Sequence, residues 1–137
     1  MTAGTYSGQG IDLPFSASGD LNAVQYRWVM PATTEGQVLQ ADGASGPEPV
    51  GVLQNDPRSL DAAAVRVAGT TLLYVDAGPS AILYGSFLTS GSTGLGVKQG
   101  GAGSNVYHAL ALQAVASGSG VLIEALLQRG QVAASQG

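Results

Sequence analysis

The segment GVLQNDPRSLDAAAVRVAG, residues 51–69 of this 137-residue chain, decides the fold. Apolar residues alternate with other residues before the polar group Asn55-Asp56-Pro57 and again from Ala64 to Val67, which predicts a strand, a turn and a second strand. One helical turn over residues 57–64 is the alternative, because Asp56 can cap a helix that begins at a proline. The segment therefore indicates a β-rich domain with at most one short helix.

Further strands are expected on both sides of this segment. Residues 24–30 are rich in β-branched and aromatic residues, and a proline follows them. Residues 36–41 form a second, short apolar stretch, which is followed by a segment rich in glycine and proline. After the segment, TTLLYV at 70–75 is expected as a separate strand, and ILYGSFL at 82–88 as the next. Residues 89–105 are dense in glycine, which predicts an exposed loop or a ragged hairpin around Leu95 and Val97.

The two C-terminal apolar stretches, 107–115 and 121–128, flank the sequence SGSG. Their alanine and leucine content also permits helices, but Gly118 and Gly120 separate them too closely for a helical hairpin, so we predict a β-hairpin. The order of apolar strand, Gln, turn and apolar strand occurs both here and around residues 50–67. This internal echo indicates two hairpins that pair across a small barrel or sandwich.

The first 20 residues are rich in Gly and Ser around a single apolar group, Ile11, Leu13 and Phe15. Alternation places these three side chains on one face of an extended strand, which suits docking onto a neighbouring subunit. An edge strand of the same domain is the equal alternative. We therefore expect an extended arm over residues 1–20 and a single β-rich domain, a small β-barrel or β-sandwich, over residues 21–137.

The composition excludes several classes of function. Only 10% of the residues are charged, against about 25% in ordinary globular proteins, and the formal net charge is −4. The five cationic side chains are scattered, which argues against nucleic-acid binding. No apolar run reaches the length of a membrane span, and the first residues lack the pattern of a signal peptide. A protein that acts without export, nucleic acid or membrane is expected.

The residues needed for catalysis are nearly absent from the sequence. There is no cysteine and a single histidine, His108, beside an apolar run, where a structural role is expected. The carboxylates fall mostly in turns, so neither a catalytic pair nor a metal site is predicted, and no cofactor motif is found. Tyr26 and Trp28 suit either an interface anchor or the core. We expect a protein that is not an enzyme.

Beyond these patterns, the segment GVLQNDP…VRVAG resembles a recurrent stretch of the capsid cement, or head decoration, proteins of tailed bacteriophages. YHALALQAVASGSGVLIEALL, residues 107–127, resembles the closing hairpin of that family. The similarity extends from about residue 50 to residue 127 and thins out before residue 36.

The resemblance implies a compact β-barrel or β-sandwich that binds the outside of an icosahedral phage head and braces it. Its partners would be the major capsid protein and further copies of itself, as a homotrimer, and it would lie on the outer surface of the virion after synthesis in the host cytoplasm. A low-charge surface is compatible with burial against the capsid and against identical neighbours, because few charged groups lose their hydration there. The contact residues expected are Ile11, Leu13, Phe15, Tyr26 and Trp28. The alternative function is a receptor- or glycan-binding module of the virion.

Overall fold

The computed structural model describes residues 9–43, 47–78, 80–99 and 106–131. These residues form nine strands and no helix, which confirms the prediction of a mainly β, barrel-like fold. The strands are β1 (Gly10–Ala17), β2 (Trp28–Pro31), β3 (Gln37–Gln40), β4 (Gly51–Leu53), β5 (Ala62–Asp76), β6 (Phe87–Ser90), β7 (Gly96–Lys98), β8 (Val106–Ala111) and β9 (Ser119–Gln131).

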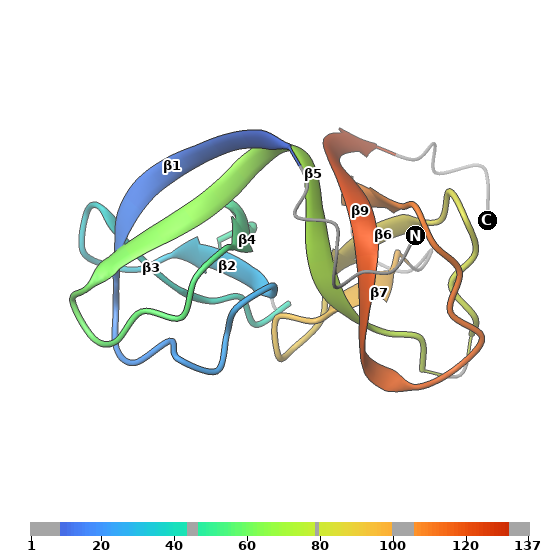
Figure 1. The fold of residues 1–137 in the computed structure, drawn as a ribbon, viewed down its shortest axis with the longest axis horizontal. Coiled ribbons are helices and arrows are strands. Elements are labelled where there is room, and N and C mark those ends of the chain that lie inside the picture. Colours follow the sequence, from blue (N-terminus) through green and yellow to red (C-terminus); the bar gives the residue numbers. More distant parts are fainter. Residues whose placement is uncertain (1–8, 44–46, 79, 100–105, 132–137) are drawn as a thin grey trace.

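The strands close into two rings that lie side by side and share the long strand β5 (Figure 1). Strands β1, β3, β2, β4 and the first half of β5 form the first ring, because β1 pairs with both β3 and β5. The second half of β5 continues through β7, β6, β8 and β9 and returns to β5. The chain is thus a pair of small five-stranded barrels.

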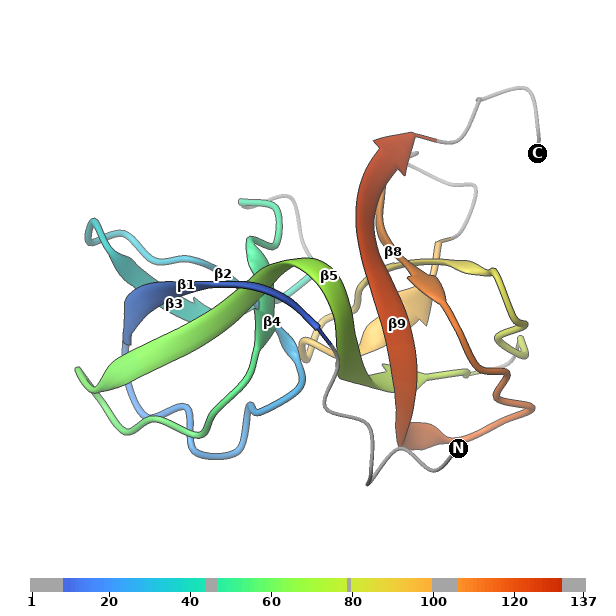
Figure 2. The same ribbon diagram turned by 45° about the horizontal axis from the view of Figure 1, so that its top comes forward.

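Strand β5 passes from one barrel to the other at Gly69 (Figure 2). Gly69 pairs with Gly10 of β1 and also with Leu127 of β9. Its φ is +94°, and an added Cβ would lie 2.1 Å from the carbonyl oxygen of Gln9. Only glycine combines this backbone angle with this close approach, so Gly69 bends the strand where a larger residue would disrupt it.

The two barrels repeat one topology. In the first barrel, the end of β1 pairs in parallel with β3, and the remaining strand pairs are antiparallel. In the second barrel, the end of β5 pairs in parallel with β7, and the remaining strand pairs are again antiparallel. The parallel pair Ala17–Val38 corresponds to Val75–Gly96, which lies 58 positions later in the chain. The internal echo of the sequence corresponds to this repeat, since β4 and β5 match β8 and β9.

Each barrel has its own apolar core. The core of the first consists of small and branched side chains: Ala17, Leu21, Val24, Val29, Val38, Leu53, Ala63 and Val65. The core of the second includes Leu73, Val75, Ile82, Leu88 and Ile123, and it extends to Trp28, Met30, Ala41 and Val52 of the first. Alternation along the strands explains this division, because Val29 points into the first barrel while its neighbours Trp28 and Met30 point toward the second.

Two predicted features around the central segment differ from the structure. Residues 64–67 and 70–75 belong to one strand, β5, because Gly69 bends the chain without ending the pairing. No helical turn forms over residues 57–64: Leu60 has a φ of +70°, and the Asn55 side chain closes the loop by bonding to the backbone of Ala62 and Ala64. A residue in the left-handed region is incompatible with a right-handed helix.

Other predicted strands are shifted along the chain. β2 begins only at Trp28, because Tyr26 has a φ of +63° and residues 25–27 turn. β6 begins at Phe87, since Gly85 with a φ of +86° forms a turn in the middle of the predicted strand 82–88. β7, β8 and β9 lie where the ragged hairpin around Val97 and the C-terminal β-hairpin were expected.

The N-terminal segment is part of the first barrel as far as it is described. Residues 10–17 form β1, which pairs with β5 on one side and, at its end, with β3 on the other. The alternative of an edge strand of the same domain is therefore the arrangement found for residues 10–15, which pair with β5 alone, whereas Ser16 and Ala17 pair with β3. Residues 1–8 of the expected arm lie outside the described residues.

Candidate interaction surfaces

The junction between the barrels is built around Trp28. The side chain lies at the start of β2, is 2% exposed, and packs with Met30 and Val52 against the core of the second barrel. Its indole ring meets the imidazole of His108 on β8 edge to face, with the ring centres 5.9 Å apart. Trp28 is thus a core residue of the whole chain, and its burial places it out of reach of an external partner.

Polar side chains surround His108 at the junction of the two barrels. Its Nδ1 lies 3.2 Å from the hydroxyl of Thr89 on β6, and its Nε2 lies 3.6 Å from a carboxylate oxygen of Glu48, which precedes β4. Arg129 of β9 donates to the other oxygen of Glu48 at 2.6 Å. Burial lowers the pKa of His108, Glu48 raises it, and Arg129 lowers it further. At neutral pH the imidazole is therefore uncharged.

A small cavity of about 140 Å³ opens beside Trp28 and His108. It is lined from the first barrel by Trp28 and residues 49–51 and from the second by His108 and residues 127–129. Nε1 of Trp28 and Nε2 of His108 have no hydrogen-bond partner in the structure. The distance from His108 to Glu48 exceeds that of a hydrogen bond, so Thr89, His108 and Glu48 do not form a connected relay for proton transfer.

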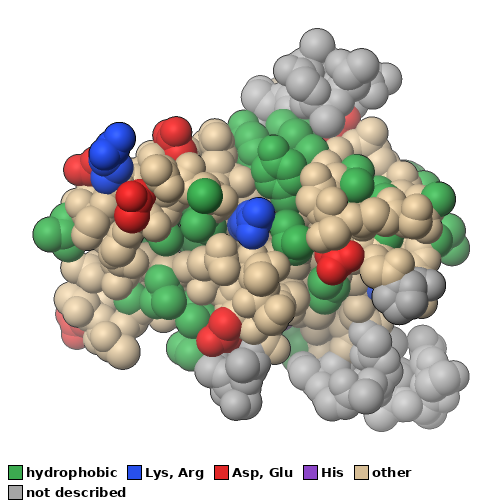
Figure 3. All heavy atoms as spheres, turned by 90° about the horizontal axis from the view of Figure 1, so that it is seen from below, with side chains coloured by type: hydrophobic (Ala, Val, Ile, Leu, Met, Phe, Trp, Pro, Cys, Tyr) green, Lys and Arg blue, Asp and Glu red, His purple; other side chains and the backbone are tan. Residues whose placement is uncertain are grey.

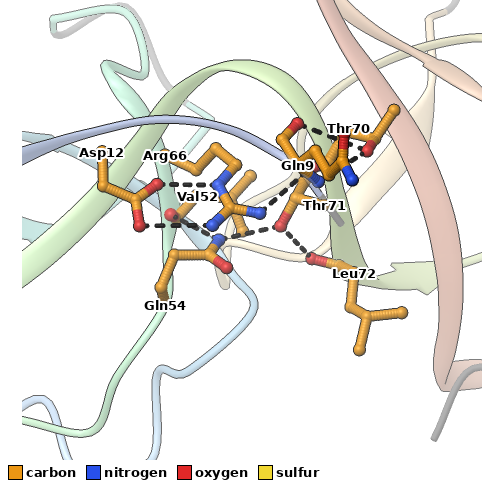
Figure 4. A network of polar contacts seen from close by, with 8 residues as sticks. All are labelled: Gln9, Asp12, Val52, Gln54, Arg66, Thr70, Thr71 and Leu72. Carbon is orange, nitrogen blue, oxygen red and sulfur yellow. Dashed lines mark hydrogen bonds and ion pairs between the residues drawn. The ribbon is translucent and has the colours of Figure 1, made fainter. Parts of the chain in front are cut away.

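A polar network holds β1, β4 and β5 together at the bend of β5 (Figure 4). Arg66 donates from Nε to Oδ1 of Asp12 at 2.7 Å, from Nη2 to Oδ2 at 3.2 Å, and from Nη1 to the carbonyl oxygen of Thr70. Gln54 donates to the hydroxyl of Thr71 at 2.8 Å. These groups join β1 and the end of β4 to β5 where β5 passes between the barrels, and they satisfy the hydrogen bonds of polar atoms near the bend. The network is structural.

The second barrel carries an apolar outer face on β6, β8 and β9. Phe87 pairs across the strands with Leu110, and Leu110 pairs with Leu126, so the three side chains form one lateral row. Tyr107 stacks on Phe87 with ring centres 4.2 Å apart. Phe87 is 39% exposed, and Tyr84 in the preceding turn is 76% exposed. We call Tyr84, Phe87, Tyr107, Leu110 and Leu126 the outer face.

The predicted contact residues do not form one surface. Ile11 and Leu13 are exposed on β1, whereas Phe15 is half-buried against the core of the first barrel. Tyr26 is half-buried, with its ring centre 6.5 Å from that of Tyr74. Sequence reasoning missed the outer face because it assigned residues 82–88 to one strand. The turn at Gly85 was the available signal that Tyr84 is exposed.

Within the described part of the chain, other kinds of site are not found. No group of three or more His, Cys, Asp or Glu residues is close enough to hold a metal ion. None of the elements there is a helix long and apolar enough to cross a membrane. Charged side chains lie scattered among uncharged ones on the face shown in Figure 3, so no patch of a single charge forms there.

Comparison with known proteins gives a likeness of fold alone. No known family and no curated protein sequence matches the chain. Among solved structures, the head fiber gp8.5 N base of bacteriophage phi29 is similar, with a TM-score of 0.63 and 16% sequence identity. The alignment covers 90% of this chain and 98% of that one. Both barrels are therefore included in the likeness.

Proposed function

We propose that this chain is a structural virion protein of a tailed bacteriophage, which binds the outer surface of the icosahedral head and stabilises the capsid lattice, as a trimer. The observation that carries the proposal is the likeness, over nine-tenths of the chain, to the base of a phage head fiber. The partners are the major capsid protein and further copies of the chain. The site of action is the outer surface of the virion.

The surface chemistry supports a binding role. Five of the exposed large apolar side chains, Ile11, Leu13, Leu83, Tyr84 and Phe87, lie on β1 or around the start of β6. Burial of apolar side chains contributes about 25 cal/mol per Å² of area removed from water. A head offers many identical sites, so contacts of modest strength suffice for high occupancy when several copies bind together. The function requires no catalysis, and we propose none.

Contact with the capsid is assigned to the exposed side chains of β1. Residues 10–15 of β1 pair with β5 on one edge, and the exposed side chains of Ile11 and Leu13 contribute to the contact. Both side chains belong to the first barrel, on the side of the fold formed by β1 and β5.

Co-sedimentation with heads tests the proposal. Purified protein is mixed with heads of its phage that were prepared without it, and the pelleted fraction is measured over a range of concentrations. Saturable binding is expected, and Ile11→Asp with Leu13→Asp should weaken it at least tenfold, because buried carboxylates are costly. Leu60→Asp is the matched control, since Leu60 is exposed but outside β1. Absence of the wild-type protein from the pellet at every concentration would refute the proposal.

Recognition of a glycan is the second candidate. It is favoured by the exposure of Tyr84, three positions before Phe87 in the chain, and by the stacking of Phe87 on Tyr107. Aromatic rings of this kind present apolar faces to sugar rings. A glycan array probed with the wild-type protein and with Tyr84→Ser tests this function. Binding of a defined glycan that is lost in the variant would support it, and an empty array would refute it.

A further inference from the structure

The repeat of the topology makes Trp28 and Phe87 equivalent positions. In the first barrel, Trp28 pairs with Val52, and Val52 pairs with Arg66. In the second, Phe87 pairs with Leu110, and Leu110 pairs with Leu126. The two rows occupy the same strands of the same topology, and their members are 58 to 60 positions apart in the chain.

The two equivalent rows differ in burial. The row of the first barrel is covered by the second barrel: Trp28 and Val52 are fully buried, and the Arg66 side chain is 12% exposed. In the second barrel, Phe87 is exposed and Leu110 and Leu126 are half-buried. All three are large apolar residues, although none of the described residues covers them as the second barrel covers the equivalent row of the first. This row therefore has the composition of a buried row in a partly exposed position.

The turn before β6 carries two further exposed apolar side chains close to Phe87 in the chain. Gly85 donates to the carbonyl oxygen of Ala111, and Ala111 donates to that of Ser86, so the turn is fixed against the end of β8. Leu83 and Tyr84 lie in this fixed turn and are exposed. The surface is thus held in place before any partner binds, which lowers the entropy cost of association.

From this asymmetry we propose that the outer face binds a second copy of this chain, which covers the row Phe87–Leu110–Leu126 as the second barrel covers the equivalent row of the first. The inference rests on the proposed function and deepens it, because it names the surface through which the copies of the proposed trimer associate. The outer face of one copy meets a different surface of the next, so the contact is heterologous. Such contacts close into a ring when the rotation permits.

The chemistry of the outer face favours a copy of this chain over a charged partner. None of the five residues of the outer face carries a charge at neutral pH, and its strands β6 and β8 contain only His108 as an ionisable group besides Tyr107. The third strand, β9, adds Glu124, which is buried, and Arg129, which pairs with Glu48. A nucleic acid or an acidic peptide would find no complementary charge here. A low-charge barrel surface fits, and the chain itself shows one such barrel packed on the equivalent row.

Sedimentation velocity at a series of concentrations tests the proposal. The wild-type protein should associate, and Phe87→Ser and Tyr84→Ser should each raise the dissociation constant about tenfold, as truncation of an aromatic residue at the centre of an interface does. Leu60→Ser is the matched control, because Leu60 is exposed on the first barrel and its variant should associate as the wild type does. A monomeric wild-type protein, or unchanged association of both aromatic variants, would overturn the proposal.

Site-specific labelling then identifies the buried surface. Because the chain has no cysteine, Tyr84→Cys and Leu60→Cys each introduce a single thiol. Maleimide should react more slowly with position 84 at associating concentrations than at dilution, whereas position 60 should react at the same rate in both. Equal rates at position 84 would place the contact elsewhere and overturn the proposal.

The proposal and the proposed function fail in different ways. A monomeric protein that still pellets with heads would overturn the self-association surface and leave capsid binding intact. A protein that associates through position 84 but never pellets with heads would refute capsid binding and support the surface. Circular dichroism of each variant separates a lost contact from a lost fold, and Tyr84→Ser should retain its fold because its side chain is mostly in solvent.

Discussion

The first barrel closes around a small cluster of Ala, Val and Leu side chains, whereas the second closes around a larger cluster that includes Trp28, Met30 and Val52 of the first. The two barrels thus share one topology, but the core of the second includes side chains of the first, whereas the core of the first is built from its own side chains. The outward-pointing residues of β2 and β4 in the first barrel complete the core of the second, so the two should unfold together. Among the residues that the structure describes, none covers the outer face of the second barrel in this way.

Truncation of the two equivalent aromatic residues tests this difference most strongly. Trp28→Ala should lower the free energy of unfolding by about 3–5 kcal/mol, because it opens a cavity between the barrels. Phe87→Ala should cost about 1 kcal/mol or less, since the ring is already partly exposed. Urea denaturation followed by circular dichroism measures both. Equal losses, or two separate transitions in the wild-type protein, would contradict a shared core.

The bend in β5 gives the next largest effect. Gly69→Ala should destabilise the protein by about 2–4 kcal/mol, because the added Cβ would overlap the backbone of residues 9 and 10 at a φ of +94°. Gly85→Ala is the control: its φ is +86°, but nothing lies within 4 Å of the added atom, so about 1 kcal/mol is expected. Thermal denaturation compares the two. Equal losses would mean that the crossing at Gly69 is not tightly packed.

The ion pair beside the bend belongs to the first barrel alone, since the residue equivalent to Arg66 in the second is Leu126. Asp12→Asn should cost about 1–2 kcal/mol, because the largely buried guanidinium loses a bidentate partner. The loss should shrink in concentrated salt, which weakens the pair in the wild-type protein as well. Urea denaturation at low and high salt measures it, and a loss that does not respond to salt would argue against a charge effect.

The smallest effect concerns the pH dependence of the junction. Because the pKa of His108 is lowered in the folded protein, the unfolded chain takes up a proton first as the pH falls. Folding stability contributed by neutral His108 is therefore present above its ordinary pKa of 6.5 and declines as the pH falls from there toward the lower folded value. His108→Gln should flatten the decline between about pH 7 and pH 5. An unchanged slope in denaturation midpoints would place the titrating group elsewhere.

Much of the fold was predictable from local patterns. The alternation in residues 50–53 and 64–67 and the glycine-bearing loop between β8 and β9 correctly indicated strands and a hairpin. The continuity of β5 was not predictable, because Gly69 followed by Thr70 is as typical of a turn as of a bend. Which of these applies depends on contacts with residues 9 and 10, more than 50 positions away in the chain.

The candidate surfaces were less predictable than the fold. From the sequence, Trp28 suited either the core or an interface. The structure places it in the core, because the second barrel covers its row. Tyr84 and Phe87 lay in a segment that was predicted as one strand, so their exposure followed only from the turn at Gly85. The equivalence of Trp28 and Phe87 depends on strand pairing, which the short and degenerate sequence echo does not reveal.

The rupture temperature of DNA-filled heads tests most directly the central claim that this chain braces a phage capsid. Heads of its phage, prepared without the protein, are heated with and without a saturating amount of it, and DNA release is followed with an excluded dye. We predict that the bound protein raises the temperature of release, and that Phe87→Ser raises it less. Release at the same temperature from fully occupied and bare heads would contradict the account.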